Sequence, residues 1–314
     1  MSAIITVTFN PALDKSTSMA SLIPDKKLKC TKPVCEPGGG GINVARAIKK
    51  LGGDAIAVYL AGGCNGERIN ELLTGEKIKQ VVIDTAESTR ENLIVEDTCT
   101  HKQYLFDMPG PTVSEKEWQN CLNAIDNIQD AAYIIASGSI PQGVPTDIFA
   151  KLALIARKKN ARFIVDTADE ALKHALKAGV YLIKPNLREL GLLVGREDIG
   201  VESIGAAAKQ IINKWNCEVV VVSMGEFGAL LVTKTFELPI MPPKVKMEST
   251  VGAGDSMVAG IVLGLAANKT LTEAVRYGVA CGTAATMQTG TELCSKTNAD
   301  HLYAIMQNEA SFVN

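Results

Sequence analysis

Short apolar runs alternate with amphipathic helical segments along this chain of 314 residues, and this alternation most constrains its fold. The runs are apolar throughout, which is typical of strands that are covered on both faces. Strands that alternate with helices predict a doubly wound, mainly parallel α/β sheet whose ligand lies beyond the carboxyl ends of its strands. The runs predicted as strands are Ile4–Phe9, Ala55–Leu60, Ala132–Ala136, Phe163–Val165, Tyr181–Ile183, Val219–Val222 and Ala229–Val232.

The segments between these runs carry helix signals: an apolar stripe, a capping box or a proline that can begin a helix. The helices are predicted near residues 44–51, after Ser114, after Pro145, at Val201–Asn213 and, as two closely packed helices, within 254–288.

Residues 15–36 and 88–107 break this pattern because they carry no helix signal. The second segment is typical of a hairpin, with strands Glu91–Glu96 and Lys102–Phe106 around a turn at 97–100. We therefore expect one α/β domain over residues 1–314, with a small β lid formed by these two insertions.

Composition narrows the functional classes. The formal net charge of −2 gives no reason to expect nucleic acid or an acidic membrane as a partner. There is no run of about 18 apolar residues, so no membrane span is expected. The N-terminal residues lack the basic start of a signal peptide, which favours a cytoplasmic protein. The eight cysteines and three histidines form no metal-ligand spacing, and catalysis based on histidine is disfavoured.

The stretch from Thr250 to Asp255 places an aspartate directly after a small-residue loop, where a long apolar helical pattern begins. Helix N-termini expose unpaired N–H groups and carry partial positive charge, so they bind anions. An aspartate there can take a proton from a hydroxyl group while the N–H groups hold a phosphoryl group in transfer. On this stretch alone, phosphoryl transfer and a purely structural helix cap are equally good interpretations.

Two N-terminal features are further candidates. Asp14 follows the first strand, where an open α/β sheet binds its ligand, although aspartate is also a common turn residue. Four glycines at 38–41 open a helix, but they come too long after the first strand for a dinucleotide fingerprint. No acidic residue follows them at a ribose-binding distance, which argues against a nicotinamide oxidoreductase. The chain also lacks a Walker A motif.

Two later segments leave structural and functional interpretations open. Asn186 and Glu189 follow a strand three residues apart, so both can point to one Mg²⁺ ion or its water shell. A capping box explains this pair equally simply and is favoured when the pair is taken alone. The turn at Ser223–Gly228 suits a hairpin loop or a nucleotide cradle.

Taken in order, these motifs resemble the ribokinase (PfkB) family of sugar kinases over essentially the whole chain. The glycine loop and the run Gly252–Asp255 match the two family motifs, about 210 residues apart. Phe9–Asp14 is similar to the branch that acts on phosphosugars, and within it members that act on fructose 1-phosphate or tagatose 6-phosphate usually carry lysine at the position of Gly40. The segments most similar to members acting on fructose 6-phosphate are Lys27–Thr31, Glu36–Ala47, Thr89–Leu93 and Leu293–Ser295.

The resemblance implies a ribokinase-like fold and ATP-dependent phosphorylation of the C1 hydroxyl of fructose 6-phosphate, a glycolytic reaction. It implies that Asp255 is the general base and that the backbone of Gly252, Ala253 and Gly254 forms the anion hole. Arg90 would hold the existing phosphate. The other residues implied for the sugar phosphate are Asp14, Gly39, Asn43, Ser139 and Lys29. Phosphorylation of tagatose 6-phosphate or fructose 1-phosphate stays open as an alternative, and a non-catalytic sugar-phosphate sensor is a more distant one.

The resemblance also implies ATP and Mg²⁺, with Glu189 organising the metal ion. The residues implied for ATP are Lys27, Lys184, Asn186, Ser223, Gly225, Gly228 and Thr250. A potassium site would use Ser249, Val251, Ala285 and Gly290. Gln288 and Glu292 differ from the asparagine and arginine of similar enzymes, which leaves potassium activation open. Lys27 and Lys29 match positions that reach a neighbouring subunit, so a homodimer through the β lid is implied.

Overall fold

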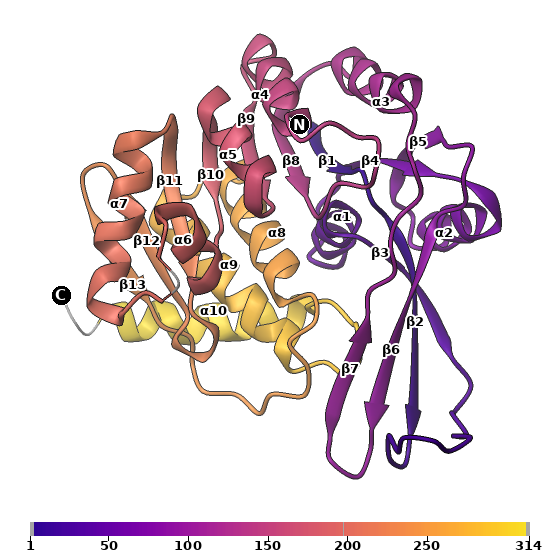
Figure 1. Ribbon diagram of the computed structural model, residues 1–314. Helices are drawn as coiled ribbons and strands as arrows, with labels where there is room; N and C mark the ends of the chain where they lie inside the picture. The colour runs from indigo at the N-terminus through magenta and orange to yellow at the C-terminus, as the bar shows by residue number, and fades with distance from the viewer. Residues whose placement is uncertain (1–2, 197, 312–314) are drawn as a thin grey trace.

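The computed structural model describes residues 3–196 and 198–311 and contains one large and one small β sheet (Figure 1). The large sheet consists of β1 (Ala3–Thr8), β4 (Ile56–Ala61), β5 (Lys79–Asp84), β8 (Ala131–Ser137), β9 (Arg162–Asp166), β10 (Val180–Ile183), β11 (Cys217–Ser223), β12 (Ala229–Thr233) and β13 (Glu237–Ile240). Its order is β13-β12-β11-β10-β9-β8-β1-β4-β5. Neighbours from β5 to β11 pair in parallel, whereas β12 and β13 are antiparallel.

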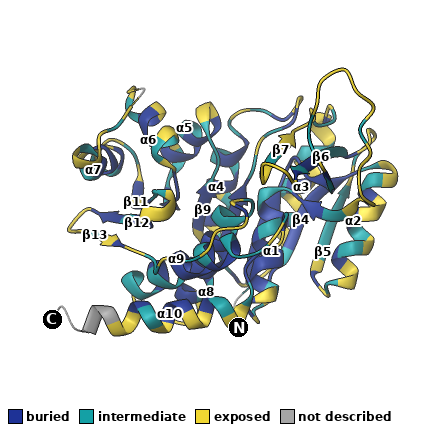
Figure 2. Ribbon diagram, turned by 90° about the horizontal axis from the view of Figure 1, so that it is seen from below, coloured by how far each residue is buried: buried dark blue, intermediate teal, exposed yellow. Residues whose placement is uncertain are grey.

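Helices cover both faces of this sheet, and each face has its own apolar core. The buried residues are coloured dark blue in Figure 2. Side chains alternate between the two cores: Tyr59 and Ile135 belong to one, Leu60 and Ile134 to the other. The helices of the first face are α1 (Gly40–Lys50), α2 (Gly63–Gly75), α8 (Ala253–Ala266), α9 (Leu271–Thr286) and α10 (Lys296–Ser311). Those of the second are α3 (Glu115–Asn127), α4 (Ile148–Lys158), α5 (Asp169–Ala178), α6 (Leu187–Val194) and α7 (Ile204–Lys214).

The doubly wound, mainly parallel architecture predicted from the sequence is confirmed, and all seven predicted strands are present within a residue or two. The capping box at Ser114 begins α3, and residues 253–286 form the two packed helices α8 and α9. The predicted helix at Val201–Asn213 begins with a 3₁₀ turn, Val201–Ser203, before α7.

The second sheet, called the small sheet below, stands off the large one (Figure 1). It contains β2 (Ala12–Met19), β3 (Val34–Gly38), β6 (Arg90–Asp97) and β7 (Lys102–Phe106), in the order β3-β2-β6-β7. β2 pairs with β6 in parallel, and the two outer strands are antiparallel to their neighbours. That this sheet acts as a lid, and that the whole chain is one functional domain, remain predictions.

Among the helices of residues 3–196 and 198–311, none combines the length and the apolar character that crossing a bilayer requires.

Candidate functional site

Asp255 lies in the first turn of α8, where several strands of the large sheet end. The side-chain amide of Asn43, in α1, donates a 3.0 Å hydrogen bond to Asp255 Oδ2, and the hydroxyl of Ser137 at the end of β8 also interacts with this carboxylate. Two effects raise the pKa of Asp255 to about 7: the larger is desolvation, and the smaller is the negative charge of the nearby Asp166 carboxylate. The bonds from Asn43 and Ser137 and the charge of Lys184 oppose that shift.

Gly252 caps the N-terminus of α8 in the left-handed region, with φ of 73°, which favours glycine. A Cβ atom there would also lie 2.6 Å from Leu293 Cδ2. The first N–H groups of a helix have no partner inside the helix. Of these, the N–H of Ala253 makes only a long, 3.4 Å contact to the Thr250 carbonyl oxygen. The turn from Gly252 to Gly254 can therefore present backbone donors to an anion.

Lys184 follows β10 and is buried beside this turn. Its Nζ lies 3.3 Å from Asp166 Oδ1, and a Cβ atom on Gly254 would lie 3.2 Å from the same Nζ. Burial alone would lower the pKa of Lys184, but the charges of Asp166, Asp255 and Glu189 outweigh it, so the pKa is raised. A buried ammonium group thus adjoins the N-terminus of α8.

The glycine loop brings α1 against the ends of β1 and β8, the point where the strand order reverses. A Cβ atom on Gly40 would lie 2.2 Å from Ser137 Oγ and 2.8 Å from its carbonyl carbon. This close approach places Asn43 beside Asp255 and explains why residue 40 carries no side chain. Gly39 is the N-cap residue of α1 and lies against Thr8 and Pro11.

Asp14 projects from β2 of the small sheet, where Asn92 of β6 donates a 2.9 Å hydrogen bond to its Oδ1. Burial raises its pKa to about 6, and the Asn92 bond and the Arg90 charge act in the opposite direction. A half-buried carboxylate held in one orientation is a suitable acceptor for ligand hydroxyl groups.

Arg90, the first residue of β6, is directed toward the end of β1. Its Nη1 contacts the Asp107 carboxylate and donates to the Met108 carbonyl oxygen at 3.0 Å, and its Nη2 donates to the Asn10 carbonyl oxygen at 3.2 Å. Its Nε is buried without a partner among the described residues. A buried donor without an acceptor is costly, so this guanidinium has capacity for a further anion.

Ser139 lies just beyond β8 and accepts a 2.9 Å hydrogen bond from the Asn10 amide. The Asn10 Oδ1 is buried and has no partner in the described part of the chain. Both side chains therefore belong to the same group of polar residues as Arg90.

Asn186 and Glu189 form the capping box of α6: the Glu189 N–H donates to Asn186 Oδ1, and the Asn186 N–H donates to Glu189 Oε2, both at 2.9 Å. The capping-box interpretation of Asn186 and Glu189 is therefore confirmed. Asn186 also forms a parallel bridge with Ser223, so the ends of β10 and β11 lie side by side. The segment from Ser223 to Gly228 is the tight connection between the antiparallel strands β11 and β12, closed by a 2.8 Å bond from the Met224 N–H to the Gly228 carbonyl oxygen.

Within residues 3–196 and 198–311, no cluster of three or more acidic, cysteine or histidine side chains is arranged to hold a metal ion. Asp166 and Glu189 nevertheless both lie close enough to Lys184 to raise its pKa. One or two carboxylates suffice for Mg²⁺ when substrate phosphates and water supply the remaining ligands. This donor set fits a metal ion that arrives with a nucleotide.

The residues implied for potassium lie on two adjacent loops. Ser249 Oγ donates to the Gly290 carbonyl oxygen at 2.7 Å and accepts from the Val251 N–H at 3.2 Å. The Ala285 carbonyl oxygen, by contrast, already accepts from the Gln288 N–H at 3.0 Å. Ser249 thus contacts both Val251 and Gly290. Glu292, which differs from the arginine of similar enzymes, is exposed.

Lys27 and Lys29 lie on the exposed connection between β2 and β3, and within one copy of the chain the structure does not bring them to the residues above. Asp166, Ser137 and Asn10, by contrast, belong to the site although the sequence motifs did not assign them. Each stands at or just after the carboxyl end of an apolar strand, and that position was the available signal.

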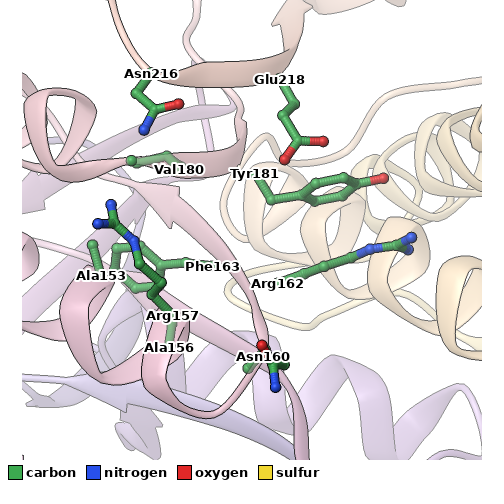
Figure 3. Close-up of a pocket in the computed structure, with 12 residues that line it drawn as sticks. Ala153, Ala156, Arg157, Asn160, Arg162, Phe163, Val180, Tyr181, Asn216 and Glu218 are labelled. Carbon is green, nitrogen blue, oxygen red and sulfur yellow. The ribbon is translucent and has the colours of Figure 1, made fainter.

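A separate hollow of about 280 Å³ lies at the opposite edge of the large sheet, where β9 to β11 begin (Figure 3). Arg162 lies over the ring of Tyr181, 4.6 Å from its centroid, and Arg157 donates to the Ala178 carbonyl oxygen. Both arginines are exposed, and their guanidinium groups already have these partners. The carboxyl ends of the strands, where Lys184 is buried beside Asp166 and Asp255, are therefore the stronger candidate for the functional site.

Comparison with known proteins agrees with this assignment. The chain is 44% identical to an ATP-dependent 6-phosphofructokinase isozyme 2 of Escherichia coli, over 98% of this chain and 99% of that protein. It is 33% identical to a 1-phosphofructokinase of Bacillus subtilis, covering 92% and 95%.

A crystal structure of Escherichia coli phosphofructokinase-2 in complex with substrates and products matches with a TM-score of 0.93 and 43% identity, covering 97% of this chain and 99% of that one. The ribokinase-like fold expected from the resemblance is confirmed. The family model of the pfkB carbohydrate kinases matches residues 7–298, and the chain belongs to this family.

Proposed function

We propose that this chain transfers the γ-phosphoryl group of ATP to the C1 hydroxyl of fructose 6-phosphate, which yields fructose 1,6-bisphosphate and ADP in glycolysis. The observation that carries this proposal is the position of Asp255: a carboxylate with a pKa of about 7, in the first turn of a helix whose N-terminus is open to an anion. The 44% identical relative, an ATP-dependent 6-phosphofructokinase, supports the choice of substrate.

Asp255 is the general base of this reaction. Its carboxylate takes the proton of the C1 hydroxyl while that oxygen attacks the γ-phosphorus atom, and the bond from phosphorus to the bridging oxygen of ADP breaks. A pKa of about 7 suits this role, because the group is ionised in a large fraction of molecules and still accepts a proton well. The Asn43 amide holds the accepting carboxylate in place. General base catalysis contributes about 10²- to 10⁴-fold in rate.

The transferring phosphoryl group is stabilised by backbone and side-chain donors. The N–H groups of the turn from Gly252 to Gly254 face the developing charge, and one such donor contributes about 3–4 kcal/mol in comparable anion holes. Lys184 adds a full positive charge at this turn, because its pKa is raised and it stays an ammonium group. Positioning and charge stabilisation are the main requirements of phosphoryl transfer.

The sugar phosphate lies between the small sheet and the end of β1. Arg90 binds the 6-phosphate with its Nη groups and its unpartnered Nε, which requires the exposed Asp107 carboxylate to leave the guanidinium. Arginine matches phosphate because its donors form a planar fork. The sugar hydroxyl groups are bound by Asp14, Gly39, Asn43 and Ser139.

Gly40 favours fructose 6-phosphate over fructose 1-phosphate and tagatose 6-phosphate as the substrate. Family members that act on those two sugars usually carry a lysine at this position. In this chain a Cβ atom there would lie 2.8 Å from the Ser137 carbonyl carbon and 2.9 Å from the Gly138 nitrogen, so the backbone leaves no space for that lysine. The chain therefore lacks the cation that those enzymes place beside the sugar.

ATP extends along the carboxyl ends of β10 and β11. The residues proposed to line it are Lys184, Asn186, Ser223, Gly225, Gly228 and Thr250. Glu189 and Asp166 hold Mg²⁺ or its water shell, and the ion, when bound, neutralises charge on the nucleotide phosphates. Glu189 uses only its Oε2 in the capping box.

A second copy of the chain covers the small sheet in this proposal, giving a homodimer. The small sheet exposes apolar side chains, including Val34 and Leu105, each 59% exposed, and Phe106, 41% exposed. Clustered exposed apolar groups mark association surfaces. Lys27 and Lys29 then reach the partner's nucleotide and sugar phosphate. We also propose that the loops of Ser249, Val251 and Gly290 bind a potassium ion.

The proposal is tested by incubating the purified protein with ATP, Mg²⁺ and each of fructose 6-phosphate, fructose 1-phosphate and tagatose 6-phosphate. Release of ADP gives kcat/KM, and NMR locates the new phosphate. We expect the highest kcat/KM with fructose 6-phosphate and a phosphate on C1. Preference for the 1-phosphate would refute the substrate assignment. Thermal stabilisation by the sugar phosphate without any ADP release would show a sensor instead of an enzyme.

A further inference from the structure

Both outer strands of the small sheet are linked to the loops that hold the N-terminus of α8. On β7, Gln103 Oε1 lies 3.1 Å from Ser249 Oγ, and on β3, Glu36 accepts a hydrogen bond from Thr291. These pairs are 146 and 255 residues apart in the sequence. Figure 1 shows the loop before α10 extending toward β7.

Ser249 connects this contact to the anion hole. Its Oγ donates to the Gly290 carbonyl oxygen at 2.7 Å and accepts from the Val251 N–H at 3.2 Å, directly before Gly252. A hydroxyl group has one proton, and the shorter bond to Gly290 uses it. With Gln103 Oε1 facing Ser249, the contact would then pair two acceptors. It is satisfied when the amide is turned by 180° to present its NH₂ group to Ser249, an orientation that fits the same heavy-atom positions.

The second link is anchored in a buried charge network. Arg46 of α1 is 4% exposed and donates to Glu36 Oε1 at 3.0 Å and to the Pro37 carbonyl oxygen at 2.9 Å. Its Nε donates to Glu76 at the end of α2. Because removing one partner of such a network is costly, Glu36 is held in one position and so is its contact with Thr291.

The two loops reached by these links enclose the start of α8. Leu293 packs under Gly252, and the Cys294 N–H donates to the Ser256 hydroxyl at 3.3 Å, next to Asp255. The N–H groups of residues 249 and 248 both contact the Thr286 carbonyl oxygen, which ties the first loop to the end of α9. A displacement of either loop therefore moves the backbone donors of the anion hole.

We propose that Gln103 is a positioning residue: through Ser249 it makes the placement of the small sheet set the geometry of the anion hole. Sugar binding on the small sheet and phosphoryl transfer at α8 are thereby coupled through a direct side-chain contact. Loss of the contact lowers kcat more than it raises KM, because the donors at Gly252–Gly254 act on charge that develops in the transition state.

The test compares Gln103→Leu, which removes the donor, with Gln103→Glu, which keeps the shape but presents only acceptors at neutral pH. Lys102→Ala on the same strand is the control, because Lys102 is exposed and its side chain forms no hydrogen bond or ion pair among the described residues. We expect both Gln103 variants to lower kcat about threefold to tenfold, the effect of one net hydrogen bond, with KM for ATP and sugar nearly unchanged. The control should behave as the wild type.

Two further readouts separate positioning from general damage. Amide hydrogen exchange of residues 249–254 should be faster in both Gln103 variants than in the control. The double variant with Ser249→Ala should lose no more kcat than Ser249→Ala alone. Additive losses, unchanged exchange or a changed molar mass in solution would refute the proposal. The kinetic part rests on the proposed function. The exchange measurement shows whether Gln103 holds residues 249–254 in place even if fructose 6-phosphate is not the substrate.

Discussion

Replacing Asp255 with asparagine should make the protein more stable while it removes the general base. In the folded chain this carboxyl group is half-buried near Asp166, and desolvation raises its pKa from 3.8 to about 7. Ionising the group above neutral pH therefore destabilises the native state. Asparagine has nearly the same shape, carries no charge and keeps an oxygen that accepts the hydrogen bond from Asn43.

The size of this effect follows from the pKa shift. A rise of about three units corresponds to about 4 kcal/mol at 1.36 kcal/mol per unit, which is an upper limit for the gain at pH 8. With about 2.1 cal/mol/K per residue of unfolding entropy over 314 residues, this limit corresponds to about 6 °C in Tm.

The sign of the pH dependence is fixed by the same shift. Between the unfolded pKa of 3.8 and the folded value of about 7, the native state binds more protons at Asp255 than the unfolded chain does. This group therefore makes the stability of the wild type fall as pH rises through that window. The asparagine variant has no group that ionises at this position. Its gain in the free energy of unfolding over the wild type should therefore be near zero at pH 4 and largest at pH 8.

The assay is thermal or urea unfolding of both proteins at several values between pH 5 and pH 8. Asp97→Asn serves as the control, because the pKa of Asp97 is shifted in the opposite direction. Backbone N–H groups, above all that of Leu22, donate to its carboxylate and lower its pKa. That variant should be less stable than the wild type by an amount that does not change between pH 5 and pH 8, because the lowered pKa of Asp97 makes stability depend on pH only below the unfolded value of 3.8. A gain for Asp255→Asn that is absent at pH 8, or that does not change with pH, would refute the reasoning.

Three further predictions concern other groups of the site. Asp107→Asn should release Arg90 and lower KM for the sugar phosphate about twofold to fivefold, as expected for an exposed ion pair, in assays at saturating ATP; an unchanged or higher KM would argue against Arg90 as the phosphate ligand. Gly40→Ala should cost about 1–3 kcal/mol in urea unfolding, since its Cβ would collide with Ser137, and wild-type stability would contradict the close approach. Arg46→Leu should cost about 2–3 kcal/mol in the same measurement because it removes charge-assisted hydrogen bonds to two half-buried carboxylates, and a loss below about 1 kcal/mol would show that the network relaxes.

The large sheet was predictable because its central strands are covered on both faces and therefore read as continuous apolar runs. The two strands that were not predicted lie at its edges. β5 begins with Lys79 and Gln80 and is only half-buried, and β13 contains Pro239. Edge strands have a weaker apolar pattern because solvent covers one side.

The site was predictable where several chemically unusual residues are consecutive. The glycine loop before α1 and the run ending at Asp255 each stand out in the sequence, and the structure joins them through Asn43. Asp166 could not be assigned in this way, because a single aspartate after a strand carries no motif. Its importance appears only when β9 and β10 pair and bring it to Lys184.

The assignments of Lys27, Lys29 and Glu189 could not be decided from the sequence, for two different reasons. Lys27 and Lys29 lie apart from the site within one copy, so their roles require the proposed second subunit. Glu189 caps α6 through one oxygen and can still face a metal ion with the other, so its structural and functional interpretations are compatible.

The most direct test of the central claim, that Asp255 takes the proton of the C1 hydroxyl, is a single-turnover measurement on Asp255→Asn. The variant, in excess over ATP, is premixed with Mg²⁺ and saturating fructose 6-phosphate, ATP is then added, and bisphosphate formation is followed by rapid quenching beside the wild type. The account predicts a rate of the chemical step that is about 10²- to 10⁴-fold lower, with both substrates still bound. A variant that forms fructose 1,6-bisphosphate within tenfold of the wild-type rate would contradict it.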